Sequence, residues 1–275
     1  MANITAAQVN ELRKQTGAGM MDCKKALVES EGDFEKAIDI LRKTGQKLAS
    51  NRADRDANEG VVLSKTTDDN KTAAVIMFNC ETDFVAKNQE IIDFTNMLLE
   101  LGLEKGCKNV DELKSLEVDG RKVEDKVIDM IGKTGEKLNL SKFQVVTGER
   151  AFSYNHPGNR VASIAAFNKD VADEQTGKDV VMQIAAMAPV ALDKESVSEE
   201  VIAKEIEIGK DIARQEGKPE EMLEKIAMGK LNKFFKESTL LNQDFYKDTK
   251  KTVQQMLTET DKGLTVVDFK RFALS

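Results

Sequence analysis

The sequence contains few of the side chains that most metal, redox and nucleophilic sites require. His156 is the only histidine in 275 residues, which excludes a histidine-rich metal site. The three cysteines lie far apart and show no Cys-X-X-Cys spacing, so reduced thiols fit better than a disulfide framework or a zinc site. We therefore expect no metal and no other cofactor.

Long apolar runs and targeting segments are also missing. No run of apolar residues approaches the roughly 20 that a membrane-spanning helix needs. Residues 1–5 lack the basic segment and apolar stretch of a secretory signal. The net charge of −7 disfavours a nucleic-acid partner held through its phosphates. These absences predict a cytoplasmic protein with neither a membrane nor a direct nucleic-acid partner.

The glycine-rich motifs of nucleotide-dependent enzymes are incomplete in this sequence. Gly132-Lys133-Thr134 has the end of a phosphate-binding loop, but the glycine required five residues earlier is replaced by Val127. Gly17-Ala18-Gly19 lacks the third glycine of a dinucleotide-binding loop and follows a predicted helix, not a strand. With a single histidine and no such loop, we do not expect an enzyme.

Helical periodicity dominates the N-terminal part. It predicts helices at 6–15 and 20–29, and a third that carries an apolar stripe from Phe34 and stops near Gly45. Met21, Ala26, Leu27 and Val28 are assigned to the core of this module, as are Met20 and Cys23. Three helices in about 40 residues are typical of a docking module, which we place at residues 1–54 with the start of a polar linker at 47–60.

An internal repeat follows. Residues 63–79 and 152–168 align without gaps at an offset of 89, and five positions are identical. Each copy reads as two strands around a turn and then a helix, at 84–101 and at about 177–187. The fold class is therefore α+β, with two repeated β-hairpin-plus-helix halves forming the core. The first half is placed at 55–145, and the second at 146–195 together with 237–275.

The remaining segments complete this plan. A helix is predicted at 110–131 and a strand at 137–148, and strands at 238–245 and 264–272 flank a helix at about 251–258. Residues 196–236 form an inserted antiparallel helical hairpin, opened by a Ser196–Glu199 capping box and turned at Gly217-Lys218-Pro219. The hairpin either folds on its own core or protrudes to contact a partner or a second copy, which would make a homodimer.

The stretch Thr82-Asp83-Phe84-Val85 joins the strand at 73–78 to the helix after it. Thr82 and Asp83 are good helix N-caps, which places Phe84 in the first helical turn. Phe84 either packs into the core or projects from the corner as a wedge. The second copy has Lys169-Asp170-Val171 after its strand and no aromatic, so the shared architecture does not require Phe84, and the core alternative is weakened.

Three motifs carry a resemblance to a known family. Residues 12–27 read LRKQTGAGMMDCKKAL and are followed by Gly32-Asp33; residues 80–88 read CETDFVAKN; residues 153–156 read SYNH. In this order they resemble the signatures of the translation elongation factor Ts family, and the resemblance covers essentially the whole chain. It implies a guanine-nucleotide exchange factor, without covalent chemistry, whose partner is the GTPase elongation factor Tu.

The resemblance also implies roles for individual residues. The helical module docks on the nucleotide domain of the partner, and the corner enters beside its magnesium site, so that Mg²⁺ is displaced and GDP loosened by Thr82, Asp83, Phe84 and Val85. His156 would contact the partner from the second half, although a lone histidine beside a Pro-Gly turn is also typical of an ordinary surface residue. The candidates for docking contacts in the module are Arg13, Asp22 and Lys24.

One departure from some relatives concerns the C-terminal end. The chain stops at Ser275, just after the last predicted strand, so we expect the contacts of a further C-terminal helical module to be absent. Two other classes of function stay open at this point. Besides an exchange factor, the chain could be a docking module without exchange activity or an enzyme with an unrecognised pocket.

Overall fold

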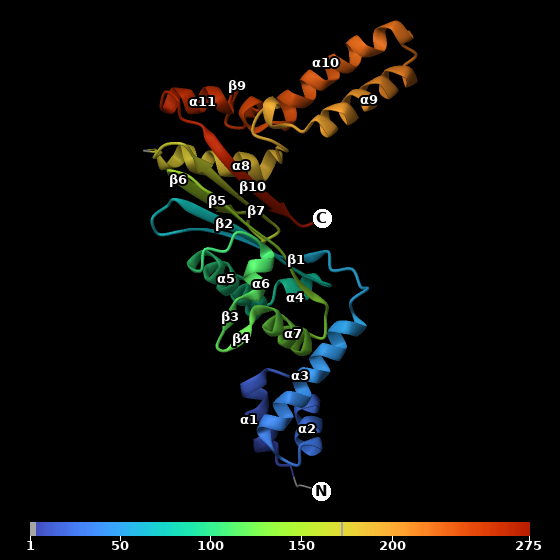
Figure 1. Ribbon diagram of the computed structural model, residues 1–275, viewed down its shortest axis with the longest axis vertical. Coiled ribbons are helices and arrows are strands. Elements are labelled where there is room, and N and C mark those ends of the chain that lie inside the picture. Colours follow the sequence, from blue (N-terminus) through green and yellow to red (C-terminus); the bar gives the residue numbers. More distant parts are fainter. Residues whose placement is uncertain (1–3, 172) are drawn as a thin grey trace. The chain divides into compact units, whose positions relative to one another are not determined.

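The computed structural model of the protein describes residues 4–171 and 173–275 (Figure 1). The chain forms two compact units. One comprises the described residues up to 63 with 76–143 and 274–275, and the other comprises 64–75 with the described residues of 144–273. Both units combine helices with strands, which confirms the predicted α+β class. The finer division into domains stays a prediction.

The first unit holds the N-terminal helices and the helices of the first half. Its helices are α1 (Ala6–Thr16), α2 (Met20–Glu29), α3 (Phe34–Asn51), α4 (Asp83–Ala86), α5 (Gln89–Glu104), α6 (Val110–Ser115) and α7 (Val123–Thr134). A short hairpin is formed by β3 (Glu117–Val118) and β4 (Arg121–Lys122). A sheet of order β1-β2-β5 consists of β1 (Glu59–Thr66), β2 (Thr72–Cys80) and β5 (Leu138–Thr147).

Local signals set the bounds of α1 and α2 as predicted. Thr5 and Gln8 form a capping box at the start of α1, and Gly17, in the left-handed region at φ +68°, ends it. The side chain of Asp33 caps α3 by accepting a hydrogen bond from the Lys36 N–H. The three helices bury one apolar cluster, made of Val9, Leu12, Cys23, Ala26, Leu27 and Ala37.

Two predictions for this module are wrong. Helix α3 does not stop near Gly45 but continues to Asn51, because Gly45 marks a close approach to α7 and not a helix end. A Cβ at Gly45 would lie 3.2 Å from the Ile128 carbonyl oxygen. Met20, Met21 and Val28 are 53%, 62% and 47% exposed, so they are not core residues. A ten-residue helix packed from one side buries a single stripe, which here is Cys23, Ala26 and Leu27.

Two predicted helices of the first half are each divided. The helix expected at 84–101 consists of α4 and α5, because Asn88 starts a new helix by accepting a hydrogen bond from the Glu90 N–H. The helix expected at 110–131 consists of α6 and α7 with the β3–β4 hairpin between them. Asp119 and Gly120 make that turn at positive φ. The predicted strand at 137–148 is confirmed as β5.

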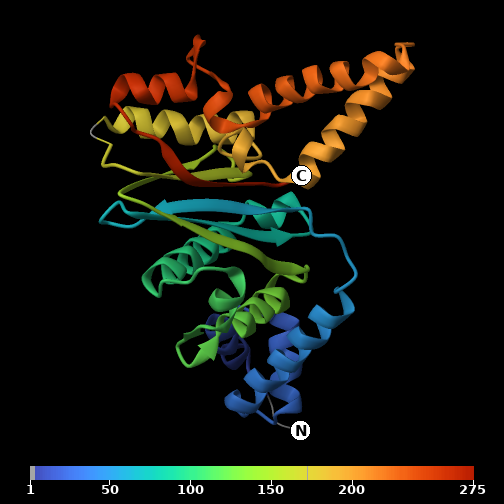
Figure 2. The same cartoon turned by 45° about the horizontal axis from the view of Figure 1, so that its top comes forward.

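The second unit is built on another three-stranded sheet, of order β10-β7-β6, in which both pairs are antiparallel. Figure 2 shows α8 and α11 on the same face of this sheet. Their apolar sides join a cluster that includes Phe152, Phe167, Ile184 and Leu257. The elements of this unit are β6 (Arg150–Asn155), β7 (Val161–Phe167), α8 (Glu174–Met187), η1 (Lys194–Ser196), α9 (Glu199–Gln215), α10 (Glu220–Ser238), η2 (Leu240–Asn242), β8 (Asp244–Phe245), β9 (Asp248–Thr252), α11 (Val253–Thr260) and β10 (Val266–Ala273).

The two predicted repeats share their turn geometry at the predicted offset. Asn70 and Asn159 occupy the left-handed region at φ +56° and +55°. The Thr67 N–H donates to the Thr72 carbonyl at 2.8 Å, and the His156 N–H donates to the Val161 carbonyl at 2.9 Å. Thr67 and His156, and likewise Thr72 and Val161, are 89 residues apart in the sequence. The alignment read from the sequence therefore describes equivalent backbone positions.

Helices α9 and α10 form the predicted antiparallel hairpin (Figure 1). A Cβ at Gly209 would lie 3.0 Å from the Ala227 Cα, so the two helices approach closely there. The predicted Ser196 capping box is wrong: Ser196 ends the 3₁₀ turn η1, and Ser198 caps α9. The strand predicted at 238–245 is also wrong over most of its length, since α10 runs to Ser238 and η2 follows.

Candidate functional site

The corner after β2 presents an aromatic side chain to solvent. Thr82 caps α4 by accepting a hydrogen bond from the Val85 N–H at 3.4 Å. Phe84 follows within this four-residue helix and is 83% exposed, the largest value among the large apolar side chains that the structure describes. The core alternative for Phe84 is therefore wrong. Exposing a phenylalanine is costly in water, which makes Phe84 a candidate contact residue.

The exposure of Phe84 follows from the shortness of α4. No residue of α4 is buried, whereas α5 directly after it buries Ile91, Leu98 and Leu99. The cap at Asn88 redirects the chain before α4 can continue into α5. Helix α4 therefore has no apolar face packed into the core, and its position depends on other contacts.

A charged side chain accompanies the aromatic. Asp83 accepts a hydrogen bond from Lys87 at 2.6 Å, and this bond holds the pKa of the Asp83 carboxyl below its usual value. The Asp83 side chain is 45% exposed. At neutral pH the corner therefore offers a carboxylate next to an apolar ring, a combination that can act on a cation and on a packed surface at the same time.

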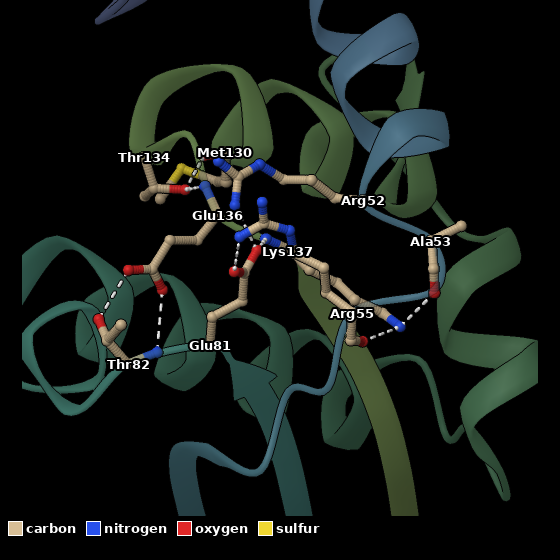
Figure 3. A network of polar contacts seen from close by, with 9 residues as sticks. All are labelled: Arg52, Ala53, Arg55, Glu81, Thr82, Met130, Thr134, Glu136 and Lys137. Carbon is tan, nitrogen blue, oxygen red and sulfur yellow. Dashed lines mark hydrogen bonds and ion pairs between the residues drawn. The ribbon is translucent and has the colours of Figure 1, made fainter.

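Behind the corner lies a network of polar contacts, shown in Figure 3. One oxygen of Glu136 accepts from the Thr82 hydroxyl at 2.6 Å, and the other accepts from the Thr82 N–H at 3.1 Å. Glu136 lies in the turn between α7 and β5. The N–H of Glu136 donates to Thr134, whose hydroxyl donates to the Met130 carbonyl.

Glu81 forms the second part of this network. It accepts from Arg52 at 2.7 Å, from Arg55 at 3.2 Å and from the Lys137 N–H at 2.6 Å. The Lys137 N–H, followed by the two guanidinium groups, holds the Glu81 pKa below its usual value. The Lys137 ammonium donates to the carbonyls of Ala53 and Arg55, so the segment after α3 is tied to the same place. Sequence reasoning assigned no role to Glu81 or Glu136, because no spacing signals the Arg52–Glu81 and Thr82–Glu136 pairs, which lie 29 and 54 residues apart.

Cys80 supports the corner from inside the protein. Its thiol donates to the Thr82 carbonyl at 3.1 Å, and burial raises its pKa to about 12. A thiol with such a pKa stays protonated at neutral pH and is a poor nucleophile. Cys80 therefore acts as a packing residue, in agreement with the expectation of reduced thiols.

The predicted docking residues of the N-terminal module all reach solvent. Arg13 lies in the last turn of α1, and Asp22 and Lys24 lie on α2. Met20 and Met21, at the start of the same helix, add exposed apolar surface between these charges. Apolar patches with a charged rim are typical of protein-binding surfaces.

His156 belongs to the second unit, at the turn between β6 and β7. It is exposed, and its Nδ1 atom lies 3.0 Å from the Tyr154 hydroxyl. Asn155 beside it accepts from the Ser64 N–H at 2.6 Å, which fixes the end of β6. His156 is thus an accessible side chain on an ordered turn.

Two absences concern other kinds of site. Within residues 4–171 and 173–275, no group of three or more His, Cys, Asp or Glu side chains is arranged to hold a metal ion. No helix in that part of the chain has the length and apolarity needed to cross a membrane. The first unit does contain a cavity of about 770 Å³, lined mainly by α3, α5 and α7, with further residues from the end of α1, the start of α2 and β4. The lysine and arginine side chains on the cavity wall include Lys133 and Arg121, which are already paired with Glu90 and Asp129.

An exposed aromatic on a polar-braced turn, together with a helical module that exposes methionines between charges, is typical of a protein that binds another protein. Comparison with known proteins agrees. The sequence profile of the family described as Elongation factor TS matches residues 81–275. Elongation factor Ts of Christiangramia forsetii is 50% identical over 275 residues and covers 100% of both chains.

Two further relatives have the same name. Elongation factor Ts of Porphyromonas gingivalis is 48% identical over 273 residues, 99% of this chain and 98% of the relative. Elongation factor Ts of Cytophaga hutchinsonii is 47% identical over 278 residues and covers 100% of both chains. The chain belongs to the elongation factor Ts family.

Proposed function

We propose that this protein is a guanine-nucleotide exchange factor of translation elongation, which binds the GDP complex of elongation factor Tu and promotes GDP release, so that GTP can bind. Membership of the elongation factor Ts family supports the general role. The observation that carries the mechanism is the 83% exposure of Phe84 on a turn held by Glu136. No bond is made or broken, and no cofactor is required.

Docking comes first. The exposed methionines Met20 and Met21 supply apolar contact area on α2, and the charges around them, Arg13, Asp22 and Lys24, set the orientation. His156 adds a contact from the second unit. We assign no direct contact to nucleic acid, which agrees with the net charge of −7.

The corner then acts on the nucleotide site of the partner. A Mg²⁺ ion is the largest local charge in such a site and bridges protein oxygens to phosphate oxygens. Phe84 displaces a packed element of the partner, Asp83 disturbs the oxygen ligands of the ion, and Thr82 and Val85 present these two side chains. Loss of Mg²⁺ weakens GDP binding. By thermodynamic reciprocity, the factor binds the nucleotide-free partner more tightly than the GDP-bound partner.

The test is release of a fluorescent GDP analogue from elongation factor Tu of the same source in the presence of Mg²⁺. The native protein should accelerate release. Burial of a phenylalanine contributes about 1.5–3 kcal/mol, so Phe84→Ala should reduce the acceleration by roughly 10- to 100-fold. Val267→Ala, which shortens an apolar side chain that is 43% exposed on β10, is the matched control and should leave it unchanged.

Other outcomes have distinct meanings. No acceleration by the folded native protein would overturn exchange activity, and retained binding in that case would leave a docking module. Equal acceleration by native protein and Phe84→Ala would keep the function but remove the wedge.

The possible homodimer through α9 and α10 stays a prediction. The hairpin leaves Ile208, Ile212 and Met222 partly exposed, at 39–45%. Sedimentation equilibrium of the native protein and of Ile208→Ser would show whether this surface joins two copies.

A further inference from the structure

We propose that Glu136 and Glu81 are positioning residues for exchange: they hold the Thr82–Val85 turn, and with it Phe84, in a fixed position relative to the end of α3. The inference rests on the proposed function and deepens it. It assigns to two carboxylates outside the turn the task of keeping the wedge in place (Figure 3).

The first step concerns what keeps α4 in place. A helix of four residues without a buried side chain gains little from packing or from its own hydrogen bonds. The two carboxylate oxygens of Glu136 accept hydrogen bonds from the Thr82 hydroxyl and the Thr82 N–H. Two charge-assisted bonds from one carboxylate fix orientation as well as distance. Glu136 therefore fixes the start of the turn that carries Phe84.

The second step connects the turn to the N-terminal helices. Glu81, the residue before Thr82, accepts from Arg52 and Arg55, and these two arginines follow directly on the last turn of α3. Only 12% of the Glu81 side chain is exposed, so water weakens these ion pairs less than it would on an open surface. Lys137 adds donors from the other side, to Glu81 and to the carbonyls of Ala53 and Arg55. A displacement of the end of α3 is therefore transmitted to the turn.

The third step separates positioning from docking. Arg13, Asp22, Lys24 and the exposed methionines lie on α1 and α2, and the residues of the network do not touch them in the contacts described above. Loosening the network should therefore keep the factor concentration that gives half-maximal exchange within about twofold of the native value. It should lower the limiting exchange rate roughly tenfold, since a charge-assisted hydrogen bond is lost. A loss of overall stability would not divide the two quantities in this way.

The first experiment needs no partner. The chain contains no tryptophan, so Phe84→Trp places a single tryptophan on the turn, which can be excited at wavelengths that the two tyrosines do not absorb. Time-resolved anisotropy should show a fast component from rotation of the exposed indole in this variant, and a larger amplitude of fast motion after Glu136→Gln or Glu81→Gln, because the backbone of the turn then adds its own motion. Glu104→Gln, which removes a carboxylate that is 70% exposed and pairs with the neighbouring Lys105, is the control and should change nothing. An unchanged fast component in correctly folded Glu136→Gln and Glu81→Gln variants would overturn the inference.

The second experiment measures GDP release with saturating factor. Glu136→Gln should lower the limiting rate in the native background and change it by less than about twofold in the Phe84→Ala background, because the carboxylate acts through the ring. Equal loss in both backgrounds would overturn the inference. Thr82→Val, which removes the hydroxyl donor, should reproduce the defect, and Thr82→Ser should not; these variants keep the test open if Glu136→Gln fails to fold.

The two experiments also separate this inference from the proposed function. If the native protein does not accelerate GDP release, exchange activity fails, and with it the role of the network in exchange, whatever the anisotropy shows. If the native protein is active and only the anisotropy changes, the network holds the turn without serving exchange, and the inference fails alone.

Discussion

The same substitution, glycine to alanine, should have opposite effects at two helical positions of the second unit. A Cβ at Gly177 of α8 would lie 2.2 Å from Phe152 Cε2 and 2.3 Å from its Cζ. Carbon atoms in contact are about 3.5 Å apart, so the ring must retreat by roughly 1.3 Å. A Cβ at Gly229 of α10 would meet nothing within 4 Å.

The surroundings of Phe152 set the size of the effect. Its ring is 8% exposed and stands edge-on to Phe167, with centroids 5.7 Å apart, while the Arg150 guanidinium lies 5.3 Å from its centroid. Overpacking in such a site costs about 3 kcal/mol at the upper end of its usual range. Replacing glycine by alanine inside a helix stabilises the folded protein by about 1 kcal/mol. Gly177→Ala should therefore lose about 2 kcal/mol, and Gly229→Ala should gain about 1 kcal/mol.

Urea unfolding followed by circular dichroism measures both changes. With a slope near 2 kcal/mol per molar urea, the midpoint should fall by about 1 M for Gly177→Ala and rise by about 0.5 M for Gly229→Ala. Adding Phe152→Leu should recover at least about 1 kcal/mol in the Gly177→Ala background, since the smaller side chain makes room. A Gly177→Ala protein as stable as the native chain would refute this account of the packing between α8 and β6.

Three other predictions follow from the described contacts. The Glu81 pKa is lowered in the folded protein, so the native protein should be more stable than Glu81→Gln above the ordinary carboxyl pKa of 4.5. The difference between their urea midpoints should shrink as the pH falls below that value, and a difference that grows at low pH would contradict this prediction. All three cysteines are buried, and Cys80 has a pKa of about 12. A thiol reagent at pH 8 should therefore react slowly with the folded protein and faster once urea is added. Fast reaction of the folded protein would contradict the burial of the cysteines. Replacing Asn70 or Asn159 by alanine should cost about 1 kcal/mol at each position, since both occupy the left-handed region, and unequal costs would argue against equivalent turns.

Local signals explain how much of the fold could be predicted. The bounds of α1 and α2, the strand β5 and the turn at Gly217 follow from caps, periodicity and positive φ, which depend on neighbouring residues. The end of α3 could not be predicted from Gly45. A glycine can end a helix or allow a neighbouring helix to approach closely, and only the position of α7 in the folded protein shows that the second applies here. Asn88 was overlooked because an apolar periodicity continued across it.

The same division applies to the candidate site. The corner at Thr82 could be predicted, since an N-cap after a strand is a local pattern, and the absence of an aromatic from the second repeat weakened the core alternative for Phe84 without deciding it. The carboxylate that holds Thr82 was not predicted. Glu136 is distant in the chain and lies in a turn of ordinary composition, so only the folded structure brings the two residues together. The roles of His156, Arg13, Asp22 and Lys24 stay predictions.

The polar ties behind Phe84 also change how binding energy is divided. A free turn must give up conformational entropy when it meets another surface, about 1–2 kcal/mol for each backbone residue that becomes fixed. Here Glu136 and Glu81 fix Thr82 and its neighbours while the chain folds. The entropy has already been lost before any encounter, so the contacts that the ring makes as exchange proceeds act without that deduction, while docking depends on α1 and α2. A pre-ordered wedge can therefore be small and still act strongly.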